Sequence, residues 1–293
     1  MIYGIKDRPP VGKMFLFGLQ MMLSVFVATV LIAQICGVAT SGALIGACLS
    51  TLVYTLITKA QSPLILSNSG AYVAPVMFAL GTAGYTGIAI GGLTACIVYS
   101  ILGLIFTKIH YENVYKVFPH SLIGSVTAVI GLNLMSYIPG YVGNTGTWGI
   151  VVAMITMLAI ALIAHYAKGI ARILPFLLGT LVGYVASVIL TLTGVCQLID
   201  FSMFTNMKLF SAPDLAFTHW TAIDWSTVIP IVIMFVAYTI SASMEALSDH
   251  AALGGIIGVD LYHTPGLGKI FFGEGVGNLI SACVGGLGSC SYG

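Results

Sequence analysis

The sequence predicts an all-α polytopic membrane protein, and three observations support this fold class: few charges, high hydropathy and long apolar runs. Only 6% of the 293 residues are charged and 58% are hydrophobic, with a mean hydropathy of +1.05. A soluble domain carries about 25% charged residues, because it must cover its core with a wetted surface. Lipid must therefore cover much of this chain, and lipid admits only helices or closed barrels. The long apolar runs favour helices over the short alternating strands of a barrel.

Charge and cysteine content exclude several classes of function. The net charge of +1 provides no basic surface, so we expect no nucleic acid as a partner. The six cysteines show neither a CxxC pair nor the spacing of metal ligands, so we expect no disulfide framework and no metal. The first thirteen residues are polar and show no cleavable signal peptide, so the first span should remain as an anchor.

Nine membrane segments are expected, because a span needs about 20 apolar residues to cross the hydrocarbon. They cover residues 14–36, 42–58, 71–80, 87–107, 119–138, 148–166, 173–194, 226–257 and 269–285. With a cytoplasmic N-terminus, the inner segments collect every Lys and Arg except Lys208, which is the positive-inside pattern. The aromatic-rich interval 196–225 then lies outside, as an extracytoplasmic interfacial segment of a cell-membrane protein.

The third segment, LILSNSGAYVAPVMFAL, is unusual for a membrane helix. Its first half contains the polar residues 67–70 (SNSG), and Pro75 follows. Non-helical backbone at membrane depth is tolerated only where protein or a water-filled cavity surrounds it. We therefore expect an extended half and then a short helix that begins near Ala71. The alternative is an ordinary helix with a kink at Pro75.

The last residues, GGLGSCSYG, repeat this pattern and enter the membrane from the opposite side. Two interrupted segments in corresponding places are typical of inverted-repeat transporters. Seven spans precede the interfacial segment, so the tail falls on the tenth segment, which is third in the second repeat. The sequence thus predicts an inverted seven-plus-seven helix repeat with broken third and tenth segments, of which the 293 residues contain only part of the second repeat.

Two carboxylates lie inside the eighth span. Glu245 and Asp249 are spaced i, i+4, which places them on one helix face about 6 Å apart, and Ser241 and Ser248 extend this polar stripe. An ionisable group at this depth costs several kcal/mol and is by default functional. The alternative is a structural ion pair, but no expected span has a Lys or Arg at that depth. We therefore interpret the pair as a functional site.

Two further ionisable residues receive structural interpretations. His250 is expected at the inner end of the eighth span, as a surface residue. Glu274 is expected near the inner interface at the start of the ninth span, where Gly273 and Gly275 predict close packing.

A carboxylate without a cationic partner in a low-dielectric environment can bind a proton at physiological pH. When it is ionised, it accepts hydrogen bonds from N–H groups of a substrate. The N-terminal ends of half-helices opposite it would donate to substrate carbonyls. A small planar ligand with alternating N–H and C=O groups, such as uracil or xanthine, fits this pattern. Amino acids or anions fit a similar set of groups.

Four motifs, in order and at matching spacing, resemble the nucleobase–ascorbate transporter family, which includes the uracil and xanthine permeases. They are EALSD at 245–249 in the eighth helix, SNSGAYVAP at 67–75 in the third segment, GLQ at 18–20 with ATV at 28–30 in the first helix, and GSCSYG at 288–293 at the start of the tenth segment. The resemblance implies a permease that imports a nucleobase with protons, with the proton as coupling ion and no cofactor.

The resemblance also implies roles for individual residues. Glu245 would hold the base through its N–H groups. The backbone at Tyr72, Tyr292 and Gly293 would meet the carbonyl or ring edges of the base, and the Tyr72 ring would stack on it. Asp249 would take part in the proton pathway or the polar network, and an aspartate at this position leans toward purines.

Gln20 is a further substrate-binding residue that the resemblance implies, although Met21 replaces the histidine that usually follows it. The family fold further implies a core domain that moves against a gate domain. Residues 1–118 (spans 1–4) and 226–293 (spans 8–9 and the start of span 10) would form the core, and 119–195 (spans 5–7) the gate. Besides the nucleobase and the lipid bilayer, a homodimer partner is expected for a full-length protein.

Three alternatives remain. A same-fold anion carrier is disfavoured because Glu245 would repel its substrate. An intramembrane aspartyl protease needs two aspartates on different helices, whereas Glu245 and Asp249 share one, so we do not expect an enzyme. The third is a non-transporting fragment of such a permease, because the family usually has a second Glu or Gln directly after the position of Gly293. On this view the 293 residues alone would not transport.

Overall fold

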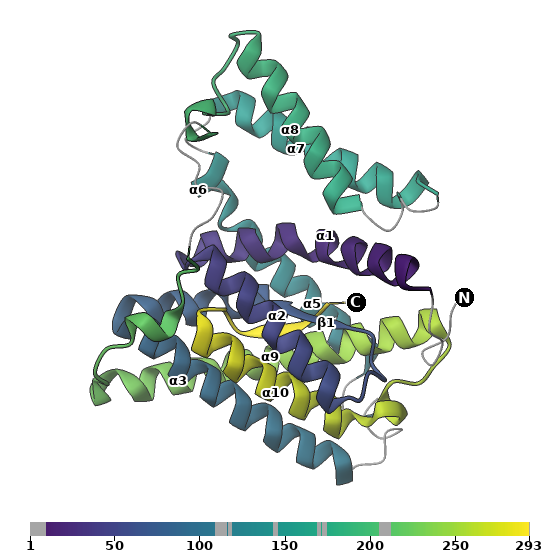
Figure 1. Ribbon diagram of the computed structural model, residues 1–293, viewed down its shortest axis with the longest axis vertical. Helices are drawn as coiled ribbons and strands as arrows, with labels where there is room; N and C mark the ends of the chain where they lie inside the picture. Colours follow the sequence, from purple (N-terminus) through teal and green to yellow (C-terminus); the bar gives the residue numbers. More distant parts are fainter. Residues whose placement is uncertain are drawn as a thin grey trace. The chain divides into compact units, whose positions relative to one another are not determined.

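The computed structural model describes residues 10–108, 116, 119–142, 146–168, 171, 175–204 and 212–292 (Figure 1). Its longer elements are the helices α1 (Val11–Cys36), α2 (Thr40–Ile57), α3 (Val73–Lys108), α5 (His120–Met135), α7 (Gly146–Tyr166), α8 (Pro175–Leu192), α9 (Trp225–Ile257) and α10 (Leu267–Val284). The short elements are β1 (Ile65–Asn68), β2 (Ser289–Tyr292), α6 (Ile138–Val142), the 3-10 turns η1 (Gly70–Tyr72), η4 (Phe201–Phe204) and η5 (Ala216–His219), and the π-turn η6 (Tyr262–Gly266).

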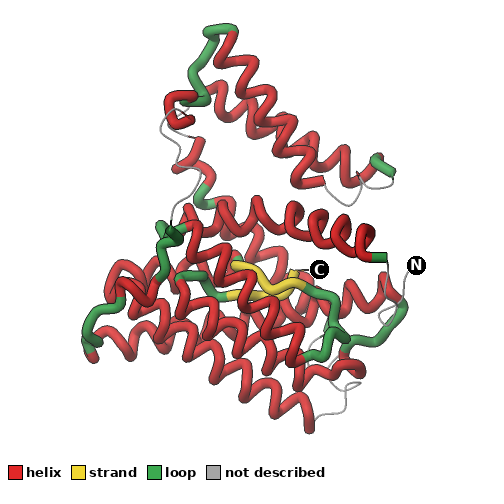
Figure 2. The backbone as a smooth tube through the Cα atoms, viewed as in Figure 1, coloured by secondary structure: helices red, strands yellow, loops and turns green. Residues whose placement is uncertain are grey.

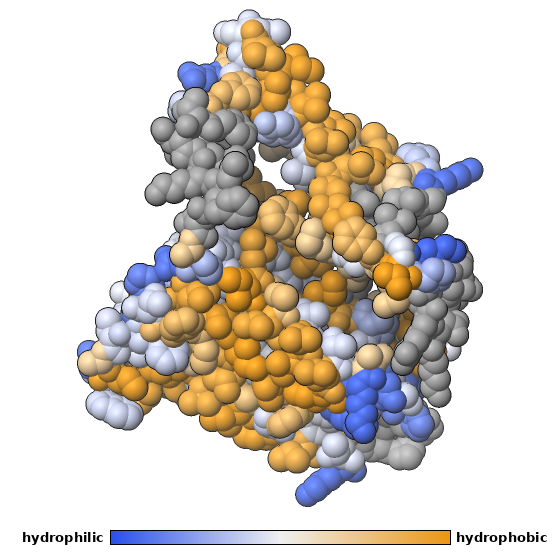
Figure 3. Space-filling view, in the orientation of Figure 1, coloured by the Kyte–Doolittle hydropathy of each residue, from blue (hydrophilic) through white to orange (hydrophobic). Residues whose placement is uncertain are grey.

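Among the described residues, seven helical stretches are long and apolar enough to cross a membrane. Large apolar side chains such as Leu56, Leu104 and Ile229 are exposed on them, and apolar residues cover much of the face in Figure 3. Such a surface suits lipid, which replaces water as the solvent. The predicted all-α multi-pass membrane protein is therefore confirmed.

The described residues contain seven candidate spans, whereas nine segments were expected. Two differences explain the smaller number. The third and fourth segments are joined in α3, where Gly84 adopts a non-helical conformation (φ 61°, ψ −151°) instead of a loop. Across this break the two halves approach closely, since a Cβ on Gly87 would lie 2.6 Å from the carbonyl oxygen of Ala79. The fifth segment, α5, has 16 described residues and is shorter than a span requires.

The chain divides into two compact units. One unit contains α2, α3, α9, α10, both strands and the C-terminal part of α1, and the other contains α7, α8 and residues 11–27 of α1. In the second unit α7 and α8 pack through small residues, because a Cβ on Gly183 would overlap Thr156. All residues of the candidate site described below, with the exception of Gln20, belong to the first unit.

Glycines bring the helices of the first unit into close contact. A Cβ on Gly91 of α3 would overlap the ring of Phe235 on α9, and one on Gly92 would overlap the methyl group of Ala282 on α10. Small residues at such positions let helix backbones approach each other, which is how membrane helices gain packing without a hydrophobic driving force. This packing fixes α9 and α10 around the two strands.

The two strands lie side by side among α2, α9 and α10, as Figures 1 and 2 show. They pair antiparallel, with Ile65 opposite Tyr292 and Asn68 opposite Ser289. Backbone groups away from water must be satisfied by the protein itself, and the pairing does this for two non-helical segments at once. The extended half and the short helix expected after it are thus confirmed as β1, η1 and the start of α3. The pairing with β2 was not predicted.

Candidate functional site

Glu245 on α9 contacts the interrupted third segment directly. Its Oε2 atom accepts a hydrogen bond of 2.6 Å from the hydroxyl of Ser69. The Ser69 Oγ in turn accepts from the backbone N–H of Ala71 at 3.1 Å and so caps η1. Within the described part of the chain, Glu245 has no salt bridge. One serine therefore fixes both the start of the short helix and the orientation of a carboxylate that no described cation neutralises.

Asp249 lies one helical turn after Glu245 on the same face of α9 and is partly buried. Its carboxylate has no hydrogen bond or ion pair with another described residue. The i, i+4 spacing keeps the two carboxylates close enough to interact electrostatically. The structure therefore presents two neighbouring acidic groups, one oriented by Ser69 and one without a protein partner in the described ranges.

Ser67 and Asn68 are fully buried and bond to protein, so protein and not a cavity surrounds this part of the extended half. The hydroxyls of Ser67 and Thr29 are 2.5 Å apart. The Asn68 Oδ1 accepts from the N–H of Leu287 at 3.2 Å, and the Asn68 carbonyl accepts from the hydroxyl of Tyr292 at 2.8 Å. These residues hold the two interrupted segments together, and only Ser69 of the polar run reaches Glu245.

The Tyr72 ring is fully buried in the structure. It stacks on Phe235 with 5.9 Å between ring centroids, and a Cβ on Gly288 would overlap its other side. Its hydroxyl donates to Thr239 at 3.1 Å, and its backbone N–H donates to the carbonyl of Ser69 at 3.1 Å. Both faces of the ring are therefore covered by protein, and the Tyr72 ring supports the site through packing.

Three further predicted site residues are only partly described. Tyr292 ends β2 and its hydroxyl bonds to the third segment. Gly293 lies outside the described residues. The backbone of Gln20 lies in α1, in the part that belongs to the other unit, and its side chain is outside the described part. Their roles at the site stay predictions.

Glu274 lies in the first half of α10 and is fully buried inside the protein. Neither carboxylate oxygen has a hydrogen-bond partner among the described residues. The close packing expected from the flanking glycines is present, since a Cβ on Gly273 would lie 2.9 Å from the Tyr54 ring and one on Gly275 3.0 Å from the Cys96 carbonyl oxygen. A buried carboxylate without partners costs several kcal/mol, which makes Glu274 a candidate functional residue.

His250 is 1% exposed, which corrects its expected place on the surface. Its Nδ1 lies 2.7 Å from the carbonyl oxygen of Ala246, and its Nε2 lies 2.7 Å from the Tyr54 hydroxyl. That hydroxyl is also hydrogen-bonded to the Ser62 hydroxyl at 2.8 Å. The spacing of His250 from Ala246 and Gly254, both small and buried, places it on the packed face of α9.

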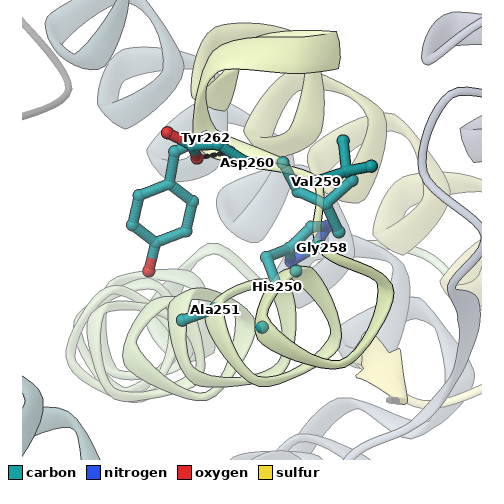
Figure 4. A pocket seen from close by; sticks show the side chains of 9 residues that line it. His250, Ala251, Gly258, Val259, Asp260 and Tyr262 are labelled. Carbon is teal, nitrogen blue, oxygen red and sulfur yellow. Dashed lines mark hydrogen bonds between the residues drawn. The ribbon is translucent and has the colours of Figure 1, made fainter.

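A cavity of about 300 Å³ lies at the C-terminal end of α9 (Figure 4). Its lining is formed by His250, Ala251, Gly254, Gly255, Gly258, Val259, Asp260, Leu261 and Tyr262. The Tyr262 hydroxyl points toward α9, where it donates to the Leu247 carbonyl at 2.8 Å. Gly255, Gly258 and Asp260 are exposed, so the cavity is open to solvent on this side.

Known proteins match this chain along its whole length. A family model described as "Permease family", named for xanthine and uracil permeases, matches residues 12–293. A uracil permease of Bacillus caldolyticus is 34% identical over 301 residues, which cover 100% of this chain and 67% of the relative. A uracil permease of Escherichia coli (strain K12) is 27% identical and is covered to 66%, with 99% of this chain. The chain thus spans about two thirds of the length of these relatives.

The fold also has a solved counterpart. The transmembrane domain of a cyanobacterium bicarbonate transporter, BicA, superimposes with a TM-score of 0.59. The match covers 93% of this chain and 72% of that domain, at 15% sequence identity. At this level of identity the similarity concerns the fold alone.

Proposed function

The chain belongs to the xanthine/uracil permease family, a family of transporters and not of enzymes, and we propose that it serves the import of a nucleobase, uracil or xanthine, together with protons. The observation that carries the proposal is the Glu245 carboxylate, which a serine of the interrupted third segment orients and no described cation neutralises. The uracil permeases among the relatives support the substrate class.

Glu245 has free capacity to bind a substrate. An ionised carboxylate offers about four lone-pair sites, and Ser69 occupies one of them on Oε2. The remaining sites accept N–H groups of a pyrimidine or purine base, and such charge-assisted bonds are shorter and stronger than neutral ones. In this proposal the backbone at Tyr72, Tyr292 and Gly293 meets the carbonyl or ring edges of the base, and Gln20 is a further contact. The Tyr72 ring supports η1 from below and does not touch the base.

The same pair of carboxylates supplies the proton coupling. Glu245 and Asp249 are adjacent on one face of α9, and neither has a cationic partner in the described part of the chain. Two neighbouring carboxylates without a cation favour the binding of one proton, which both can share. A proton bound here neutralises the site while the substrate crosses, and its release on the inner side frees the site again.

The architecture that we propose is an inverted seven-plus-seven repeat in the cell membrane, with a cytoplasmic N-terminus. The antiparallel pairing of β1 with β2 supports it, because the two strands come from segments that correspond in the two repeats. Residues 1–118 and 226–293 form the core in this proposal, 119–195 form the gate, and 196–225 form the extracytoplasmic interfacial segment. A homodimer is expected for the full-length protein.

Uptake into liposomes tests this function. The complete gene product is reconstituted, and labelled uracil and xanthine are offered with and without an inward proton gradient. We expect saturable uptake that rises with the gradient and collapses when a protonophore is added. Uptake of neither base, or uptake that ignores both the gradient and the protonophore, would contradict the proposal. Mutual competition between unlabelled uracil and xanthine identifies the preferred base.

A further inference from the structure

We propose that Asn278 is a positioning residue of the base-binding site: it holds the free edge of β2 on α10 and so sets the place of Ser69, which orients Glu245. This inference rests on the proposed function, because Glu245 is the residue that would hold the base. It starts from a fully buried amide that the site as described so far does not use.

Asn278 makes a two-point contact with one residue of β2. Its side chain is 0% exposed on α10. The Asn278 Oδ1 accepts a hydrogen bond of 2.7 Å from the backbone N–H of Ser289, and the Nδ2 donates one of 2.7 Å to the Ser289 carbonyl. The Nδ2 also donates to the Glu274 carbonyl at 2.9 Å. Both hydrogens of the amide are thus used, and the side chain cannot turn over without the loss of these bonds.

This contact satisfies a strand edge that no described strand covers. β2 pairs with β1 along one edge, and the described part of the chain contains no third strand in this sheet. Ser289 is fully buried, and backbone groups away from water need partners from the protein. Asn278 supplies a partner for both the N–H and the carbonyl of Ser289.

The free edge of β1 is held in the same way. The Thr51 hydroxyl on α2 accepts from the N–H of Leu66 at 3.1 Å and donates to the Leu66 carbonyl at 2.8 Å. In the proposed seven-plus-seven repeat, α2 and α10 are the second spans of the two halves. Each half therefore contributes one side chain that holds the strand of its own third segment. This correspondence supports a role for Asn278 in placing the paired strands.

A short path of hydrogen bonds leads from Asn278 to Glu245. The residue before Ser289 is Gly288, whose carbonyl accepts from the backbone N–H of Ser69 at 3.0 Å. The Ser69 hydroxyl donates to the Glu245 Oε2 at 2.6 Å. A displacement of β2 at Ser289 therefore moves the acceptor that holds the backbone of Ser69.

The packing around Ser69 leaves little space to absorb such a displacement. A Cβ on Gly288 would overlap the fully buried Tyr72 ring. The backbone N–H of Tyr72 donates to the Ser69 carbonyl at 3.1 Å. Ser69 is thus held by Gly288 at its N–H and by Tyr72 at its carbonyl. Because tightly packed groups transmit displacements, a shift of β2 changes where the Ser69 hydroxyl meets Glu245.

Equilibrium binding to the complete gene product tests the role of Asn278. Asn278→Ala removes the two-point contact, and we expect the Kd for labelled uracil or xanthine to rise about ten-fold, which does not exceed the effect of losing the Ser69 hydroxyl through which Asn278 acts. Tyr54→Phe is the matched control, because it removes two buried hydrogen bonds, of 2.7 Å to His250 and 2.8 Å to Ser62, outside the two strands. It should lower thermal stability and leave Kd unchanged.

A double variant separates positioning from general damage. The effects of independent residues on a free energy add, whereas the effects of residues that act through one another do not. Asn278→Ala combined with Ser69→Ala should therefore bind the base within about two-fold of Ser69→Ala alone. A further rise of about ten-fold in the double variant, as additivity requires, would overturn the proposal. A wild-type Kd in Asn278→Ala would overturn it as well.

Two more measurements cover the case in which Asn278→Ala does not fold. Asn278→Ser has a hydroxyl too short to bridge both groups of Ser289, but it leaves room for water to satisfy them, so the same rise in Kd is expected and a wild-type Kd contradicts the proposal. In the wild type, solid-state nitrogen–carbon distances should show the Asn278 side chain in contact with the Ser289 carbonyl when the base is bound. Their separation on binding would refute the proposal. If the wild type binds neither base, the proposed function fails instead.

Discussion

Replacement of Ser69 by alanine removes the hydrogen bond that the Ser69 hydroxyl donates to the Glu245 carboxylate. The bond is 2.6 Å long and has an ionisable acceptor. Hydrogen bonds to charged groups contribute about 1.5–3 kcal/mol, which corresponds to roughly 10- to 100-fold in a dissociation constant. Without this donor, Glu245 must satisfy Oε2 in another way, so it spends less time in the geometry that leaves its other oxygen free for the substrate.

The expected result is therefore a 10- to 100-fold higher Kd for labelled uracil or xanthine, measured by equilibrium binding to the detergent-purified complete gene product. Ser67→Ala is the matched control, since Ser67 lies on the same interrupted segment, is equally buried and bonds to Thr29. It should lower thermal stability and leave Kd unchanged. Ser69→Thr keeps the hydroxyl and should restore binding.

Two results would refute this reasoning. If Ser69→Ala binds the base with the wild-type Kd, the orientation of Glu245 by Ser69 does not matter for recognition. If Ser67→Ala weakens binding as much as Ser69→Ala does, the effect comes from general damage to the paired strands.

Two further predictions concern stability. Gly288→Ala adds a methyl group that overlaps the buried Tyr72 ring, so the melting temperature should fall by an amount that corresponds to about 1–3 kcal/mol, and an unchanged melting temperature would contradict the packing described. Asp224 begins α9, and its hydrogen bonds from the Ser226 side chain and backbone N–H lower its pKa. Because the folded pKa is below the unfolded value of about 3.9, its contribution to stability is complete above that value and is lost as the pH falls through the folded pKa. Wild type should therefore melt above Asp224→Ala at pH 7, with a difference that shrinks toward pH 3, and a pH-independent difference would be the contrary outcome.

The sequence was sufficient for the membrane fold and for the break in the third segment. Nineteen charges in 293 residues leave lipid as the only solvent for most of the surface. The run at 67–70 is too polar for a lipid-facing helix, so an extended segment inside the protein followed from local chemistry alone. A loop was expected between the third and fourth segments, but the structure has only a break at Gly84. A single glycine can adopt a non-helical conformation, so no run of polar loop residues is needed there.

The pairing of β1 with β2 could not be predicted from the sequence. Ile65 and Tyr292 are more than two hundred residues apart, and backbone hydrogen bonds carry no residue-specific signal. Gly288 covers one face of the Tyr72 ring because β1 and β2 pair. The buried position of this ring could therefore not be predicted from the sequence either. Side-chain contacts across such a ladder follow from register, which a single sequence does not specify here.

The buried positions of His250 and Glu274 could have been predicted from the sequence. His250 lies at i+4 from Ala246 and i−4 from Gly254, and small residues at these intervals indicate a packed helix face. Glu274 stands between two glycines, which correctly indicated close packing, and a carboxylate in such packing must be deep inside the protein. Glu245 itself was predicted on α9 from its depth and spacing, and its contact with Ser69 became known only from the fold.

Binding of the base to Glu245→Gln tests the central claim most directly. The glutamine keeps the volume of the side chain and removes the charge that accepts substrate N–H groups, so the variant should insert and melt at or above the wild-type temperature. Equilibrium binding of labelled uracil and xanthine to the complete gene product should then weaken by at least about 100-fold. A folded Glu245→Gln variant that binds either base with the wild-type Kd would show that Glu245 does not hold the substrate.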